Sequence, residues 1–146
     1  MSKQHPFPRE ATLEVRDNCL CLHLQRAARV VARRFDEVFR PLGLTNGQFS
    51  LLMSLNRPEP PVMGDVASLL AIDRTTLTAN LKPLERRGLV TVSPDPKDRR
   101  SRRLALTDKG HALLAEAYPL WRAAHRDLES LIESADRLRA DLIRLS

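Results

Sequence analysis

Five cationic side chains crowd residues 97–103, within the stretch SPDPKDRRSRR, and one anion, Asp98, lies among them. The cations are Lys97, Arg99, Arg100, Arg102 and Arg103, so five positive charges against one negative charge leave a local charge of +4. Such a density of like charge repels itself unless a negative partner is near, which indicates a polyanion. A solvated loop without a partner is the simpler alternative.

The segment DRTTLTANLKPLERRG carries a second group of polar side chains. Asp73 is a good N-cap for a helix from about Arg74 to Arg87, which Gly88 closes and Pro83 should kink. Its apolar side is made by Leu77, Leu81 and Leu84. Its other faces carry side chains that can contact bases or phosphates, namely Arg74, Thr75, Thr76, Thr78, Asn80 and Lys82. The alternative is an ordinary polar surface helix.

Both cysteines of the chain stand in DNCLCLHL, residues 17–24. On an extended strand Cys19, Cys21 and His23 would share one face and could bind a metal. The apolar period around them is helical, and on a helix Cys19 and Cys21 point about 200° apart. We therefore expect neither a shared metal nor a disulfide between them. Cys21 belongs to the apolar stripe and is predicted to face inward as a small hydrophobic residue.

The composition favours one basic domain that binds duplex nucleic acid. The chain has 146 residues, a formal net charge of +6 and a sequence pI of about 10.1. That charge favours a nucleic acid or a membrane surface as partner. Aromatic residues make up 4%, too few for the stacking platforms that bind single strands, so duplex DNA is the better candidate.

Several classes of protein are excluded. The apolar runs are too short to span a bilayer and the N-terminus lacks the apolar stretch of a secretory signal, so we expect a cytoplasmic protein with reduced thiols. The nucleophile and phosphate-binding motifs of common enzymes are missing, and the histidines are scattered at His5, His23, His111 and His125. We expect no enzyme, no cofactor and no metal site.

Apolar spacing predicts the elements that position the polar clusters. A polar, Pro-containing tail is followed by a long amphipathic helix that closes near Pro41 and Gly43. The stretch Thr45-Asn46-Gly47-Gln48 has the form of a capping box and begins a second helix. A short third helix fits 65–70, and its inward side chains should be Val66, Leu69 and Leu70.

The second half of the chain begins with an antiparallel hairpin. Two short strands, 89–92 and 104–106, flank the basic stretch, which becomes the hairpin loop. Thr107 caps a helical region that runs to the C-terminus, with apolar steps of three and four over almost five heptads. Pro119 should bend or interrupt it. This apolar seam predicts a dimer, although packing against the first helix of the same chain would also use it.

The order of helix, turn, polar helix and basic hairpin describes a winged helix-turn-helix, and residues 44–110 resemble the MarR family of bacterial transcription regulators. LTNGQFSLL is similar to the second-helix segment of the family, and DRTTLTANLKPLERRGLV to its recognition helix and first wing strand. DRRSRRLALTDKG is similar to the wing signature, Asp-x-Arg followed by a Leu-Thr-x-x-Gly helix start.

This resemblance implies a mainly α fold with a small β-hairpin wing in the single chain 1–146. The winged helix-turn-helix would cover 44–107, and dimerisation helices would cover 9–42 and 108–146. The helix-turn-helix would read the major groove of one half-site of a pseudo-palindromic operator. By position, Asp98 would orient Arg100 through a salt bridge so that Arg100 enters the minor groove. Arg99, Arg102 and Arg103 match no fixed family role and are interpreted as phosphate neutralisers.

DNCLCLHLQRAAR also resembles the first helix of the OhrR branch, the organic hydroperoxide sensors, whose pattern is approximately Asn-Gln-Leu-Cys-Phe-x-Leu-Tyr. This match places Cys21 where that branch has its reactive cysteine. With Asp17 or Asn18 as N-cap, Cys21 would lie near the first turn, where the helix dipole stabilises a thiolate. The tyrosines around that thiol are replaced by Gln25, Phe35 and Asn46. We therefore expect Cys21 and these three residues to line a site for a small hydrophobic, phenolic or oxidant effector.

The sequence therefore predicts a homodimeric, sequence-specific regulator that binds double-stranded DNA, acts as a repressor and is released by a small ligand or by cysteine modification. The alternative is an architectural DNA-binding protein without an effector.

Overall fold

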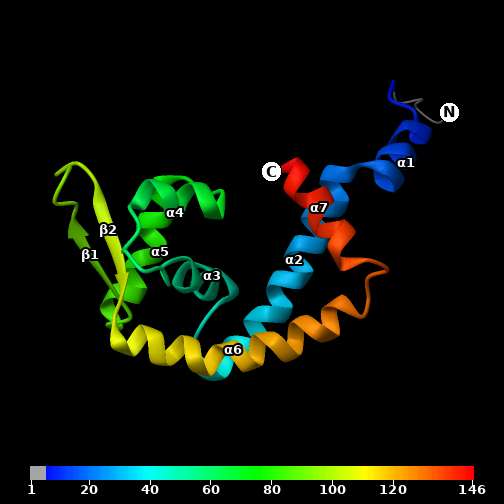
Figure 1. The fold of residues 1–146 in the computed structure, drawn as a ribbon. Coiled ribbons are helices and arrows are strands. Elements are labelled where there is room, and N and C mark those ends of the chain that lie inside the picture. The colour runs from blue at the N-terminus through cyan, green and yellow to red at the C-terminus, as the bar shows by residue number, and fades with distance from the viewer. Residues whose placement is uncertain (1–5) are drawn as a thin grey trace. The chain divides into compact units, whose positions relative to one another are not determined.

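The computed structural model describes residues 6–146 (Figure 1). Part of the expected polar tail and His5 fall on residues 1–5 and lie outside the described residues. The chain divides into two units, of which the first ends at Arg34 and the second spans Phe35–Ser146. Within residues 6–146, no helix combines the length and the apolar character needed to cross a membrane.

The first unit contains α1, Arg9–Asn18, and most of α2, Leu20–Phe39. The predicted helical span of 9–42 includes α1, but its separation from α2 as a helix of its own was not predicted. Cys19 separates the two helices with an extended backbone, φ −68° and ψ 110°. Its N–H donates to Val15 O at 2.9 Å, and its Sγ accepts from the N–H of Leu22 at 3.4 Å. Cys19 therefore closes α1 and takes the N-cap position of α2 that we predicted for Asp17 or Asn18.

The break at Cys19 changes the expected geometry of the two thiols. The separation of about 200° assumed one continuous helix through both residues, and Cys19 is not helical. Both cysteines are free thiols. Across residues 6–146, no group of three or more His, Cys, Asp or Glu side chains is arranged to hold a metal ion.

Helix α2 ends as predicted, near Pro41 and Gly43. A 3-10 turn, η1, covers Arg40–Leu42, and Gly43 follows with φ +65°, which a residue with a side chain rarely adopts. Arg87 fastens this turn, because its guanidinium donates to the carbonyl oxygens of Gly43 at 2.7 Å and Leu42 at 3.2 Å. The end of α2 is thereby joined to a residue 44 positions further along the chain.

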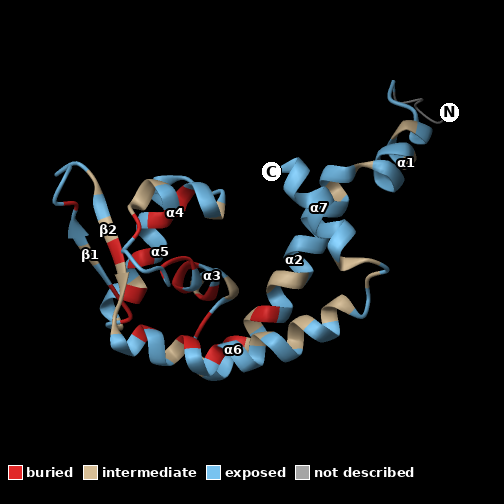
Figure 2. Cartoon of the chain, viewed as in Figure 1, coloured by how far each residue is buried: buried red, intermediate tan, exposed pale blue. Residues whose placement is uncertain are grey.

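The second unit continues with α3, Asn46–Ser54; α4, Met63–Leu70; α5, Arg74–Arg86; and the strands β1, Val90–Pro94, and β2, Arg102–Leu106. The strands pair antiparallel, with Val90 opposite Leu106 and Pro94 opposite Arg102. Figure 2 shows buried residues on the helices and strands of this lobe. Its core includes side chains with no exposed surface: Leu52, Val66, Leu77, Leu84 and Leu104.

The capping residues begin the helices where the sequence predicted, but one side chain of α4 was predicted to face the wrong way. The capping box is present, since Gln48 N–H donates to Thr45 Oγ1 at 3.2 Å and Thr45 N–H donates to Gln48 Oε1 at 3.0 Å. Leu69, predicted to face inward, is 62% exposed. Ala67 is buried in its stead, because α4 turns its Val66–Ala67 side toward the core and leaves Leu69 beside α3 and α6.

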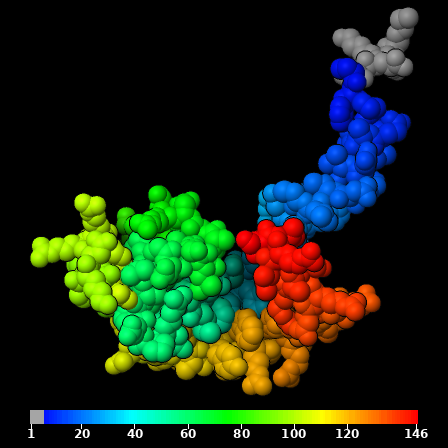
Figure 3. Space-filling view, turned by 45° about the horizontal axis from the view of Figure 1, so that its top comes forward, coloured from blue at the N-terminus to red at the C-terminus, as the bar shows by residue number. Residues whose placement is uncertain are grey.

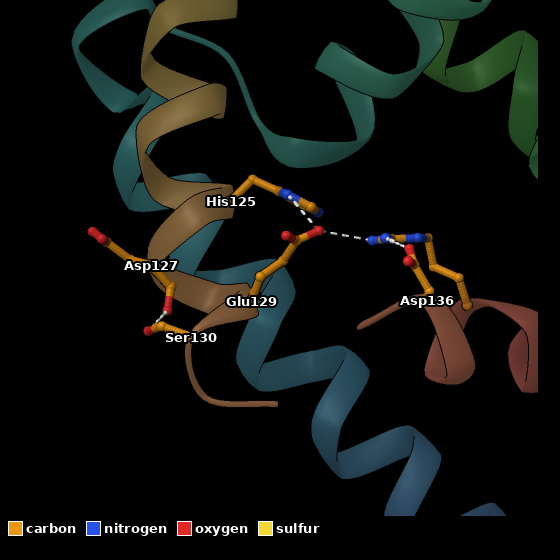
Figure 4. Close-up of polar contacts among 6 residues, drawn as sticks. His125, Asp127, Glu129, Ser130 and Asp136 are labelled. Carbon is orange, nitrogen blue, oxygen red and sulfur yellow. Dashed lines mark hydrogen bonds and ion pairs between the residues drawn. The ribbon is translucent and has the colours of Figure 1, made fainter. Parts of the chain in front are cut away.

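Two further helices complete the chain: α6, Asp108–Glu129, and α7, Ala135–Leu145. Pro119 lies inside α6 without ending it, and the interruption comes at residues 130–134. Ser134 caps α7 by accepting from the N–H of Arg137 at 3.3 Å. Arg139 links the two helices, with 2.8 Å to Glu129 and 2.6 Å to Asp136, and His125 lies 3.5 Å from the same Glu129 carboxylate (Figure 4).

The Leu-Thr-x-x-Gly segment joins the wing to α6. Thr107 Oγ1 donates to Gly88 O at 2.6 Å and accepts from the N–H of Gly110 at 3.0 Å, so one hydroxyl closes the hairpin and caps the helix. Gly110 is buried against the start of β1, where a Cβ atom would lie 2.3 Å from Leu89 O. Residue 110 must therefore be glycine, because the backbone of α6 and the backbone at Leu89 lie too close together to admit a side chain.

Candidate nucleic-acid interface

Helix α5 presents the predicted contact residues to solvent. Asp73 caps it by accepting from the N–H of Thr76 at 2.7 Å, and this hydrogen bond lowers the pKa of the Asp73 carboxyl below its usual value. Leu77, Leu81 and Leu84 are buried and fix which side faces the core. All six side chains that the sequence predicted as contacts are exposed: Arg74, Thr75, Thr76, Thr78, Asn80 and Lys82.

Two of these side chains are also held within the protein. Thr78 Oγ1 donates to Arg74 O at 2.8 Å and lies 3.8 Å from Met63 Sδ, at the start of α4. The Arg74 guanidinium lies over Gly64, where a Cβ atom would be 3.0 Å from its Nη2. A shallow hollow of about 340 Å³ lies on the surface of α5 and is lined by Arg74, Thr75, Thr78, Ala79 and Lys82. This hollow gives α5 a concave basic face.

The wing tip carries the exposed cations, and Figure 3 shows it, in yellow, standing out from the green lobe of α4 and α5. Asp98 Oδ1 accepts from the backbone N–H of Arg100 at 3.0 Å, and Ser101 N–H donates to Asp98 O at 3.0 Å. Among residues 6–146, the Arg100 guanidinium forms no ion pair. The predicted salt bridge between Asp98 and Arg100 is therefore wrong, because the carboxylate is used to close the turn.

The three cations interpreted as phosphate neutralisers lie in different surroundings. Arg99 and Arg102 are exposed, and Arg102 Nη1 donates to Arg99 O at 3.2 Å. Arg103 is partly buried, lies 3.4 Å from Asp95 Oδ1 through its Nε and donates to Pro60 O at 2.6 Å through its Nη1. The basic stretch therefore combines exposed cations with one that is engaged inside the protein.

The cysteine site predicted from the sequence spans both units, so each part is described by itself. In the first unit, Gln25 Nε2 donates to Cys21 Sγ at 3.3 Å. Cys21 is exposed, so the prediction that it faces inward is wrong for the single chain. In the second unit Phe35 is buried, and Asn46 donates to Asp36 Oδ1 from both its N–H, at 2.7 Å, and its Nδ2, at 2.8 Å. Those hydrogen bonds lower the pKa of Asp36.

Comparison with known proteins decides the family. Residues 44–101 match the model of the MarR family. Chain and structure are similar to the DNA complex of the M. tuberculosis transcriptional regulator MosR, with 38% identity, a TM-score of 0.81, and coverage of 88% of this chain and 93% of that one. The chain belongs to the MarR family.

Curated relatives of this MarR chain are transcriptional regulators and not enzymes. The transcriptional activatory protein BadR of Rhodopseudomonas palustris is 33% identical over 115 residues, 76% of this chain and 66% of the relative. The organic hydroperoxide resistance regulator of Bacillus subtilis is 32% identical over 100 residues, 68% of this chain and 67% of the relative. The chain spans 57% to 66% of the length of three curated relatives that it matches.

Sequence reasoning missed two features of this MarR chain. The first is Asp95, a buried carboxylate inside Pro-Asp-Pro at the end of β1; an acid between two prolines beside a basic run was the available signal. The second is an open groove of about 570 Å³ without charged side chains, lined by Phe49, Ser50, Met53, Ser54, Leu69, Leu70, Tyr118 and Trp121. Tyr118, Trp121 and His125 stack along it, with ring centroids 6.1 and 4.7 Å apart.

Proposed function

We propose that this MarR-family regulator is a homodimer that binds one pseudo-palindromic operator in double-stranded DNA and represses transcription until an effector releases it. One observation carries the proposal: the polar face of α5 and the cationic wing tip are both exposed on one lobe. An α-helix fits the major groove, and arginine favours a narrow minor groove. In this arrangement Arg100 enters the minor groove, and Arg99 and Arg102 neutralise phosphates. The base and phosphate contacts of α5 come from Arg74, Thr75, Thr76, Thr78, Asn80 and Lys82.

Exposed apolar side chains on the terminal helices support the homodimer. Leu20 and Leu24 of α2, four residues apart, are 70% and 38% exposed, and Leu138, Leu142 and Leu145 of α7, at steps of four and three, are 39%, 39% and 64% exposed. Figure 2 shows both helices largely exposed. Apolar surface of this extent at helical spacing marks an association surface. In the proposal, residues 9–42 and 108–146 form the dimer and residues 44–107 form the DNA-binding lobe.

Selection from a library of random duplexes tests the proposed function. We expect the full-length protein to enrich a pseudo-palindrome whose protected half-sites lie about one helical turn, roughly 10–10.5 base pairs, apart. Native mass measurement should find two chains on each duplex. Uniform protection without an enriched sequence would favour the architectural alternative. A reporter driven by a promoter that carries the enriched sequence then distinguishes repression from activation, the role that the name of BadR gives to that relative.

Release by an effector has two supports. Cys21 lies in the first turn of α2 as an exposed free thiol that an oxidant can reach, and the Gln25 amide donates to its sulfur. The groove of α3, α4 and α6 is apolar and aromatic, which suits an uncharged or phenolic ligand. The two sites require different effector chemistry, because an oxidant reacts with the thiol and a phenolic compound occupies the groove.

Cumene hydroperoxide should release DNA from the wild-type protein and not from Cys21→Ser, because serine cannot be oxidised to a sulfenic acid. Electrophoretic mobility shift with the selected duplex measures this release. Cys19→Ser is the matched control and should still respond, since its sulfur serves as a helix cap. Equal release from wild type and Cys21→Ser would remove Cys21 as the sensor.

A further inference from the structure

We propose that Arg103 is a positioning residue that fixes the wing relative to the recognition helix α5 and does not neutralise a DNA phosphate. This inference rests on the proposed function, because it assumes that the wing and α5 contact the same duplex. It replaces the role that the charge of the basic stretch suggested for this residue.

The guanidinium of Arg103 joins both ends of the hairpin loop to the segment before α4. Its Nη1 donates to Pro60 O at 2.6 Å, and its Nε lies 3.4 Å from Asp95 Oδ1. The main chain connects the same two segments. Arg103 forms an isolated antiparallel β-bridge with Val62, and the N–H of Leu104 donates to Pro61 O at 2.9 Å. Strand β2 is thereby attached to residues 60–62 by side chain and main chain together.

Asp95 explains why this arginine is not free to bind phosphate. Its side chain is 9% exposed, and burying a carboxylate costs free energy unless a cation or hydrogen-bond donors compensate it. Among the described residues, Arg103 is the cation within ion-pair distance of it. Asp95 also shapes the loop, since its Oδ1 accepts from the N–H of Lys97 at 3.2 Å and its own N–H donates to Ser101 O at 3.0 Å. A phosphate that captured Arg103 would leave Asp95 uncompensated.

Arg102 provides the contrast within the same strand. It is exposed, and among the described residues the only hydrogen bond of its side chain is from Nη1 to Arg99 O at 3.2 Å. Nothing buried depends on it. The two arginines therefore have the same charge and are adjacent in the chain, and they differ in what their side chains contact.

The anchor connects the two elements that address DNA. Residues 60–62 lead directly into α4, whose first residues Met63 and Gly64 lie against Thr78 and Arg74 of α5. A wing fixed to residues 60–62 is thus fixed relative to α5 through α4. The angle between them decides whether Arg100 reaches the minor groove while α5 occupies the adjacent major groove.

The salt dependence of binding separates an anchor from a phosphate contact. The probe is the duplex that the wild-type protein selects from the random library. We expect Arg103→Ala and Asp95→Asn each to lower affinity roughly tenfold, as loss of a charge-assisted hydrogen bond would, with the slope of log affinity against log salt unchanged. Arg102→Ala, the matched control, should reduce that slope by about 0.9 per subunit. Arg103→Ala behaving like Arg102→Ala, with Asp95→Asn binding as wild type or more tightly, would overturn the inference.

A charge-conserving variant and altered duplexes distinguish positioning from general destabilisation. Arg103→Lys retains the charge but cannot bridge Asp95 and Pro60 O as a guanidinium does, so we expect it to bind as weakly as Arg103→Ala. Exchanging A·T for G·C pairs beneath the wing should weaken wild-type binding and leave the Arg103 variants unaffected, while exchanges beneath α5 weaken all of them. Wild-type affinity for Arg103→Lys would overturn the inference. Failure of the wild-type protein to select any duplex would overturn the proposed function as well.

Discussion

Arg100→Ala should weaken operator binding roughly 100-fold, because a dimer loses two minor-groove contacts of about 1–3 kcal/mol each. The structure gives this residue no role that would compete with DNA. Its guanidinium forms no ion pair among the described residues, and Asp98 holds its backbone N–H in place. Removal of the side chain should therefore leave the turn, the fold and the dimer unchanged. Fluorescence anisotropy with the selected duplex at fixed salt measures the loss.

Two controls make the result specific to the Arg100 side chain. Arg99→Ala removes an adjacent exposed arginine and should cost far less, with its effect largely in the salt slope. Asp98→Asn retains an oxygen that can accept from the Arg100 N–H, so its effect should also be small. Unchanged affinity of Arg100→Ala at matched salt would refute the placement of the wing tip in the minor groove.

Gly110→Ala should destabilise the winged lobe by about 2 kcal/mol or more, because the added Cβ would lie 2.3 Å from Leu89 O. A backbone carbonyl cannot rotate away as a side chain can, so α6 would have to shift along the hairpin. That shift would strain the hydrogen bonds that Thr107 makes to Gly88 O and Gly110 N–H. Thermal denaturation followed by circular dichroism should show a Tm several degrees lower.

Gly47→Ala is the matched control for this prediction. Gly47 lies in the first turn of α3, and nothing stands within 4 Å of the Cβ that alanine would add. Because alanine is the better helix former, this variant should be as stable as wild type or slightly more stable. If Gly110→Ala and Gly47→Ala melt at the same temperature, α6 and β1 do not approach as closely as described.

Features governed by neighbours in the sequence could be predicted. The capping box of Thr45, the N-cap of Asp73 and the helix end at Gly43 each depend on residues within a few positions, so the local sequence was enough to predict them. The break at Cys19 is also local but was missed. The apolar stripe of α2 begins at Cys21 and carries no mark of the break before it, where Asn18 Nδ2 donates to Glu14 O at 2.9 Å and the Cys19 sulfur supplies the cap. A period reports which face is apolar and not whether the backbone is continuous.

Features that require distant segments to meet could not be predicted. The charge of residues 97–103 was evident from the sequence. That Arg103 is bound within the protein while its neighbours are exposed depends on a hydrogen bond to Pro60, 43 positions earlier. The groove likewise combines α3, α4 and α6, none of which indicates a cavity by itself. Asp98 shows a third kind of error, since a carboxylate two residues from an arginine can bind either its guanidinium or its backbone N–H, and the tight turn favours the latter.

Arg87 has a consequence for how this sequence can change. Its guanidinium is bound by the main-chain oxygens of Leu42 and Gly43, so its partners are atoms that every amino acid possesses. The side chain of residue 42 can therefore vary without loss of these hydrogen bonds, and residue 43 is constrained by its positive φ and not by its chemistry. These two hydrogen bonds between the end of α5 and the end of α2 consequently depend on the side chain of Arg87 alone, and their loss cannot be compensated by a complementary side chain at residue 42 or 43.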